Sequence, residues 1–452
     1  MATPEADFFR SINQSFSTCF SNAMKLALTL EKTSDAELAA KRSFAYNPQN
    51  SEILDLFPQY EDTLTLLSSI ISSATADIQK DNSNLEAWLL LGYCYLQFGD
   101  FPNAFAALIQ FDCEKLEKEN DLRYPEYYYY ALSIIYHHFN YQIQSFKWYT
   151  KLMNCSKFSS FLYKDDFYYR LGILCRSLSK YSESIQYFTK IIDSPPNGLK
   201  KADIQFQIAY TYQLFGKNEE ARTIYKQLLD NYPNNIYIKQ QYILFLFLSQ
   251  STFDNNLLNN IIGDSLSNKP NPQLLFFYAC ILLKKNDLSS AYDYFKQCVS
   301  YYYDSPEFWC LFGILYAKNE QWTDAIMAFQ RSLYVRNEFE EGWLNLGYSY
   351  EHLKDIESAS RIYQTALMNC PQSSAITERT NNLAMGRSNV LLYDISDLSK
   401  NYKYFPQVPQ KAANEYISAI PYFPAFLFGE EDDSKFSKMA TFPASLFEDN
   451  IE

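Results

Sequence analysis

The chain has 452 residues, of which only 11 are glycine and 17% are aromatic, and its formal net charge is −13 at pH 7. Few glycines and many large rings favour helices that pack through aromatic side chains, and they argue against a loop-rich β fold or a Rossmann-type fold. The acidic balance argues against direct nucleic-acid binding, because affinity for phosphate backbones comes from clustered lysine and arginine. The acidic residues are dispersed, and we expect them to be solvated.

The cysteines and the hydropathy of the sequence indicate in which cellular compartment the protein is expected. The nine cysteines are scattered and include no CxxC pair, so neither a zinc site nor a disulfide framework is predicted. No basic segment precedes an apolar run at the N-terminus, and no stretch approaches the length of a membrane-spanning helix. The sequence therefore predicts a soluble intracellular protein with reduced cysteines and no membrane partner.

Residues 1–84 contain two amphipathic stretches that predict helical regions, over residues 6–30 and 53–80. A polar stretch with Asn47, Pro48 and Asn50 separates them. We interpret this region as a degenerate repeat or an N-terminal cap, since a stacked array must cover its first apolar face.

From Leu85 to Ser373 the same residue types recur at fixed offsets, most regularly in two 34-residue blocks that begin at Pro306 and Glu340. Positions 4, 8, 20 and 24 hold Trp309, Gly313, Ala325 and Phe329 in the first block and Trp343, Gly347, Ala359 and Tyr363 in the second. This pattern predicts two antiparallel helices per block, with a buried large residue at position 4 and small residues at positions 8 and 20, where the helices cross most closely.

Five further blocks keep this register and begin at residues 85, 126, 165, 202 and 272. A polar insert, residues 114–123, follows the first of them. The pattern blurs over residues 236–269, where a helix at 237–248 and a short second helix at 257–262 are predicted, so this segment is interpreted as a degenerate repeat. Residues 374–386 predict a capping helix.

Period and pattern resemble those of tetratricopeptide (TPR) repeats. The expected fold is therefore all-α: a TPR α-solenoid, a right-handed superhelix of antiparallel helix pairs. Its array would span residues 85–373, with about seven clear repeats and one degenerate repeat.

No constellation of catalytic residues is visible. The chain has three histidines, of which His137 and His138 are adjacent and would point about 100° apart on a helix, while His352 stands alone. No nucleophile elbow, phosphate-binding loop or zinc-protease motif occurs. We predict no enzymatic activity, no cofactor and no metal.

Positions 5 and 9 of each first helix should project into the concave groove of such a solenoid. They hold Leu89, Tyr93, Tyr130, Ile134, Tyr169, Ile173, Phe206, Tyr210, Phe276, Cys280, Cys310, Ile314, Leu344 and Tyr348. None is charged, which disfavours the lysine and asparagine clamp of chaperone-binding TPR domains. An apolar groove predicts binding of a hydrophobic or amphipathic peptide. The alternative is that these side chains pack against neighbouring repeats. Under the groove interpretation, alanine at Tyr169 or Phe206 weakens partner binding and leaves the fold intact.

Residues 387–452 form a tail rich in proline, phenylalanine and acid, which we expect to be largely disordered. It contains the pattern F-P-A-x-L-F twice, each time followed by acidic residues, with Phe423, Leu427 and Phe428 in the first copy and Phe442, Leu446 and Phe447 in the second. The repetition is either coincidence in a phenylalanine-rich tail or a tandem docking peptide. Such a peptide could bind in a groove, including that of its own chain.

Local sequence is more specific than the repeat pattern. The informative runs are residues 308–316 (FWCLFGILY), 343–351 (WLNLGYSYE), 169–174 (YRLGIL), 194–196 with 201–209 (SPP and KADIQFQIA) and 88–96 (WLLLGYCYL). Across residues 85–385 they resemble the TPR subunit of the yeast-type general transcriptional corepressor, the partner of Tup. They are equally similar to the TPR region of UTX-type histone lysine demethylases.

The chain also departs from this family. Its first repeats, which contact the WD40 partner, would fall in residues 1–84, where no clear repeat is visible. Glutamine-rich tracts and a jumonji domain are missing from this sequence, and without the latter no demethylase activity is expected.

The resemblance implies a nuclear adaptor that bridges DNA-bound transcription factors to a WD40 corepressor and, through it, to chromatin. Two alternatives stay open: a TPR scaffold of another complex, such as a cell-cycle ubiquitin ligase or a co-chaperone, and a regulatory subunit of a chromatin-modifying enzyme.

Overall fold

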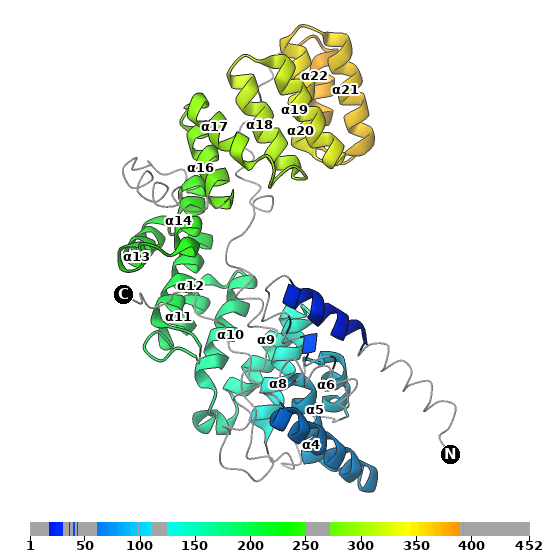
Figure 1. Cartoon of the computed structure of the whole chain (residues 1–452), viewed down its shortest axis with the longest axis vertical. Coiled ribbons are helices and arrows are strands. Elements are labelled where there is room, and N and C mark those ends of the chain that lie inside the picture. Colours follow the sequence, from blue (N-terminus) through cyan, green and yellow to red (C-terminus); the bar gives the residue numbers. More distant parts are fainter. Residues whose placement is uncertain are drawn as a thin grey trace, which may run out of the picture. The chain divides into compact units, whose positions relative to one another are not determined.

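The computed structural model describes residues 18–29, 36, 39, 40, 43, 61–97, 99–110, 124–196, 198–249, 272–387 and 392 (Figure 1). Every element in this part of the chain is a helix and none is a strand, which confirms the all-α prediction. The chain divides into two compact units, Met1–Ile224 with Gln410–Glu452 and Tyr225–Pro409. We describe each unit by itself.

In the first unit, residues 18–29 are helical and α4 spans Glu61–Lys80. The following helices are α5 (Leu85–Gln97), α6 (Phe101–Leu108), α8 (Pro125–His138), α9 (Gln142–Met153), the short 3-10 helix η2 (Ser156–Ser160), α10 (Lys164–Ser177), α11 (Tyr181–Lys190) and α12 (Lys201–Leu214). Helices α5 and α6, α8 and α9, and α10 and α11 pack as pairs. Helix α4 packs on α5, α6 on α8, α9 on α10 and α11 on α12, so that each pair covers the next.

The division between the units falls within α13 (Asn218–Asn231). The second unit continues with α14 (Ile236–Leu248), α16 (Pro272–Lys284), α17 (Leu288–Cys298), α18 (Pro306–Lys318), α19 (Trp322–Val335), α20 (Glu340–His352), α21 (Ile356–Asn369) and α22 (Ser374–Ala384). Here α16 pairs with α17, α18 with α19 and α20 with α21, and α22 packs on the last pair.

Small residues at position 8 let the two helices of a pair approach closely. A methyl group added at Gly92 would lie 2.8 Å from the Leu108 side chain, and one at Gly172 would lie 2.8 Å from the Phe188 ring. Gly313 faces the Phe329 ring in the same way, at 2.5 Å. Position 8 therefore touches position 24 of the same repeat, and the prediction of small residues at the crossing is confirmed.

Two of the three tryptophans at position 4 are less buried than expected. Trp343 is 8% exposed, which confirms the predicted buried ring, whereas Trp88 and Trp309 are only half-buried, so the prediction of a buried ring at position 309 was wrong. Each indole Nε1 donates a hydrogen bond to the carbonyl oxygen six residues earlier, which belongs to Asn82, Tyr303 or Asn337, at 3.1, 2.8 and 2.6 Å. Each indole N–H thus binds the loop that precedes its helix pair, as expected for a large ring with one polar group.

Turns inside the pairs also repeat. Gly99, Asn140, Ser179, Gly216, Asn286, Glu320 and Lys354 hold the same position of their repeats, and all have φ between 59° and 80°. The next residue precedes the second helix, and in three repeats it is an aspartate, Asp100, Asp287 or Asp355, that accepts a hydrogen bond from the third backbone N–H of that helix. These caps fix where the second helix begins.

Several predicted features lie outside the described residues. They are the insert at 114–123, the second helix at 257–262, the polar stretch around Pro48 and the tail beyond Leu392. Of the predicted helical regions 6–30 and 53–80, the structure describes residues 18–29 and 61–80, and both are helical.

Candidate peptide-recognition surface

The predicted groove residues lie on the first helix of each pair. Helices α5, α8, α10 and α12 carry them in the first unit, and α16, α18 and α20 carry them in the second. Thirteen of the fourteen side chains are at most 5% exposed, and Tyr348 is half-buried. Because most of these side chains are enclosed, peptide binding by them stays a prediction, beside the alternative that they pack within the chain.

In the first unit, groove positions of one repeat contact the start of the next. Tyr93 donates a hydrogen bond from its hydroxyl to the carbonyl oxygen of Tyr127 at 2.7 Å, and the two rings meet edge to face. Tyr127 and Tyr130 both contact the ring of Phe161, with centroids 5.4 and 5.3 Å apart. These contacts form an aromatic seam between repeats rather than an open channel.

A buried ion pair lies within this seam. Asp166 and Arg170 are both fully buried, and Nε of Arg170 lies 2.7 Å from Oδ2 of Asp166. Tyr130 donates a hydrogen bond from its hydroxyl to the same carboxylate. Burial raises the pKa of Asp166, while the Arg170 charge and the Tyr130 hydrogen bond oppose that rise. A buried charge needs such partners, so Tyr130 has a structural role whether or not it contacts a ligand.

Four acidic residues at position 2 of their repeats are buried, contrary to the expectation that they are solvated, whereas Glu86 at the same position is exposed. Asp166, Asp203, Glu307 and Glu341 are at most 8% exposed. Oδ2 of Asp203 accepts a hydrogen bond from the backbone N–H of Lys200 at 2.8 Å, and Glu307 pairs with Arg336 at 2.6 Å. Helix N-termini favour negative charge. Acidic residues recur at position 2 in the sequence, but this recurrence alone does not predict burial, because Glu86 is exposed.

Two arginine side chains contact residues at the predicted groove positions or next to them. The guanidinium of Arg176 lies 4.9 Å above the ring of Tyr210 and donates a hydrogen bond to Oε1 of Gln207 at 2.6 Å. In the second unit, Arg379 donates to the carbonyl oxygen of Leu344 at 3.0 Å. The apolar groove positions are thus flanked by charged groups, which the pattern of positions 5 and 9 alone does not reveal.

Groove positions of the second unit combine aromatic and sulfur contacts. The ring of Phe276 lies 5.0 Å from that of Tyr302. Asn345 donates a hydrogen bond from Nδ2 to the Cys310 sulfur at 3.5 Å. Tyr348 contacts the ring of Trp322 at 5.9 Å. Because Tyr348 is half-buried and the other groove residues are buried, it is the predicted groove residue that a partner could reach without rearrangement of the fold.

Titratable groups in this region are adapted to packing. Burial raises the pKa of the Cys280 and Cys310 thiols, so both stay protonated and weakly nucleophilic. Burial lowers the pKa of His137 to about 4. His138 stacks on Phe101 with ring centroids 3.6 Å apart, and His352 stacks on Trp322.

The described residues contain no group of three or more histidine, cysteine or acidic side chains placed to bind a metal ion. None of the described helices combines the length and the apolar character that crossing a bilayer requires.

Comparison with protein families identifies the repeats. Residues 203–235 match one tetratricopeptide repeat family model, and residues 165–197, 272–304 and 340–373 match another. Together with the helix pairs, these matches show that the chain folds as an all-α array of tetratricopeptide repeats. No curated protein matches the chain.

Solved structures resemble the chain at a coarse level. The type IV pilus biogenesis factor PilW is 16% identical, covers 48% of this chain and 97% of its own, and has a TM-score of 0.40. The APC/C hetero-tetramer Cut9–Hcn1 is 16% identical, covers 80% of this chain and 74% of its own, and has a TM-score of 0.37. The TPR domain of P58(IPK) is 12% identical, covers 82% of this chain and 99% of its own, and has a TM-score of 0.31. These similarities carry no argument about function.

Proposed function

We propose that this chain is a non-enzymatic scaffold whose repeats bind other proteins, and that it serves in the nucleus as a transcriptional corepressor subunit. In this role it bridges DNA-bound transcription factors to a WD40 corepressor and chromatin. The tetratricopeptide repeats support protein partners in general. The resemblance to the corepressor family supports the specific assignment.

One observation supports the resemblance on which the specific assignment rests. The two most distinctive runs, residues 308–316 and 343–351, lie on α18 and α20, two helices that pack together. Cys310 from the first run accepts the hydrogen bond of Asn345 from the second, and both side chains are buried. These two of the five informative runs therefore pack against each other. They support a shared repeat architecture, whereas partner choice depends on surface residues.

A tethering experiment tests the proposal. The full chain is fused to a DNA-binding domain and placed upstream of an active reporter gene. We expect repression that requires the cell's WD40 corepressor, because the chain acts as the bridge. Gly347→Ala is the matched loss-of-packing control, since it crowds the Tyr363 ring in the last pair. A folded tethered chain that leaves the reporter unchanged contradicts the corepressor assignment.

A further inference from the structure

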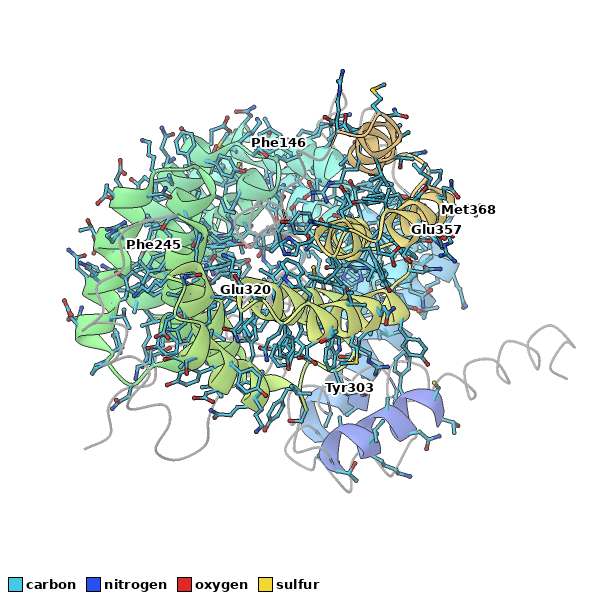
Figure 2. All side chains as sticks on the ribbon, turned by 90° about the horizontal axis from the view of Figure 1, so that it is seen from above. Phe146, Phe245, Tyr303, Glu320, Glu357 and Met368 are labelled. Atoms are coloured by element: carbon cyan, nitrogen blue, oxygen red, sulfur yellow. The ribbon has the colours of Figure 1, made fainter. Side chains whose placement is uncertain are left out.

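The outer face of α9 presents apolar and basic side chains to solvent. Tyr141 and Ile143 are 62% and 77% exposed, and Lys147 is exposed one helical turn after Ile143. Lys151 lies 4.8 Å above the Trp148 ring, and Lys180 of the next repeat lies 3.9 Å above the ring of Phe146, which is labelled in Figure 2. We call Tyr141, Ile143, Phe146, Lys147, Lys151 and Lys180 the α9 patch.

This patch is basic within an acidic protein. Residues 139–164 contain four lysines and no aspartate or glutamate, although the chain as a whole has a net charge of −13. Acidic side chains lie near lysines of the patch and of this segment. Glu183 lies 3.6 Å from Lys180, and Glu126 interacts with Lys157. Among the described second helices, α9 alone carries lysines without any acid: α6 has no charge, and α11, α13, α17, α19 and α21 all carry acid.

Tyr141 occupies a position that other repeats use for stability. It precedes α9 where Asp100, Asp287 and Asp355 cap their helices, and its side chain makes no capping hydrogen bond. A tyrosine there gives up a cap and exposes a ring to water. Exposed apolar side chains that replace a stabilising residue are typical of binding surfaces.

The tail has the complementary chemistry. Phe423 to Phe428 is followed by Glu430, Glu431, Asp432 and Asp433, and Phe442 to Phe447 is followed by Glu448 and Asp449. Each copy offers aromatic and leucine anchors and then carboxylates, which match exposed rings flanked by lysines. The 30 residues between Leu392 and Phe423 can extend over about 100 Å. Tethering also raises the local concentration of the tail to about a millimolar.

We propose that the α9 patch is the docking site for the acidic F-P-A-x-L-F segments of this chain's own tail. The aromatic and leucine side chains cover Tyr141, Ile143 and Phe146, and the carboxylates that follow pair with Lys147, Lys151 and Lys180. This surface is separate from the groove positions, so it does not depend on the proposed corepressor function.

Trypsin cleavage of the full chain tests the proposal, because Lys435 and Lys438 lie between the two tail copies. The variant Ile143→Asp with Lys147→Glu reverses the chemistry of the patch at exposed positions. We expect cleavage after Lys435 and Lys438 to become about fivefold faster than in the wild-type chain, as loss of an apolar anchor and an ion pair predicts. An unchanged melting temperature shows that the fold survives. Unchanged tail cleavage in the folded variant overturns the proposal.

A matched control sits on another second helix. Met327 on α19 is 60% exposed and is followed one turn later by the exposed Arg331. Met327→Asp with Arg331→Glu should leave tail cleavage at the wild-type rate. Equal acceleration by this control variant would show that the effect is general charge repulsion, and would overturn the assignment to α9.

Neutralising the tail completes a double-mutant cycle. The variant Glu430→Gln, Glu431→Gln, Asp432→Asn and Asp433→Asn should accelerate cleavage on its own. Combined with the α9 variant it should add little, because both remove the same contact. Accelerations that multiply would contradict direct contact. Protection that fades on dilution would contradict docking within one chain.

Discussion

At the scale of single residues, the absence of one methyl group sets how closely α18 and α19 approach. A Cβ atom at position 313 would lie 2.5 Å from the Phe329 ring. We expect Gly313→Ala to lower the free energy of unfolding by about 2 kcal/mol through overpacking, as measured by urea denaturation. Phe329→Leu should relieve the clash, so the double variant should lose less than the sum of the two single losses. Additive losses would show that the two residues do not interact.

His137 should make stability depend on pH. Burial lowers its pKa from 6.5 to about 4 in the folded chain, so the unfolded chain binds the proton more readily in the interval between these values. The free energy of unfolding should therefore fall as pH decreases from about 6.5 to about 4, by up to about 3 kcal/mol. Denaturation curves across this range for the wild type and His137→Gln measure the effect. A slope that persists unchanged in the variant would assign it to other groups.

Burial changes what substitution in the groove should do. Phe206 is 1% exposed, so Phe206→Ala should cost about 3 to 5 kcal/mol of folding free energy rather than leave the fold intact. Tyr348 is half-buried, and Tyr348→Ala should preserve the melting temperature while weakening binding to a partner that uses the groove. A stable, fully folded Phe206→Ala chain would show that this ring is not part of the core.

At the scale of helices, the caps offer a test by comparison between repeats. Gln321 precedes α19 and makes no capping hydrogen bond, whereas Asp355 caps α21 at the same position of its repeat. We expect Gln321→Asp to raise the free energy of unfolding by about 1 kcal/mol, and Asp355→Ala to lower it by a similar amount. Thermal or chemical denaturation of both variants checks the pair. A neutral Gln321→Asp substitution would show that this turn does not admit the cap.

Helix pairs and their crossings could be predicted from sequence because both depend on local periodicity. The spacing of Gly92 and Gly313 in the sequence predicted that they lie at helix crossings. Each lies where the two helices of its repeat approach most closely. Depth of burial could not be predicted in this way, because spacing shows which way a side chain points and not what covers it. Asp166 and Arg170 illustrate this limit: their spacing of four residues on a helix fits an exposed pair equally well, yet both are fully buried.

At the scale of the whole molecule, repetition explains why the sequence predicts the fold better than it predicts the function. Each repeat contacts its neighbours, so the same residue types are needed at each junction, as with the tryptophans whose indoles bind the preceding loops. Partner choice has no such repetition. We expect it to depend on surface residues that occur once, such as Tyr348, the groove residue that is half-buried.

We propose that this array bridges DNA-bound regulators to a WD40 corepressor. Affinity purification of the tagged full chain from nuclear extract, with partners identified by mass spectrometry, tests it most directly. Gly347→Ala, which disturbs the last helix pair, serves as the matched control. We expect the wild-type chain to recover a WD40 corepressor with chromatin proteins, and the variant to recover less of both. Recovery of ubiquitin-ligase or chaperone subunits without chromatin proteins would contradict it.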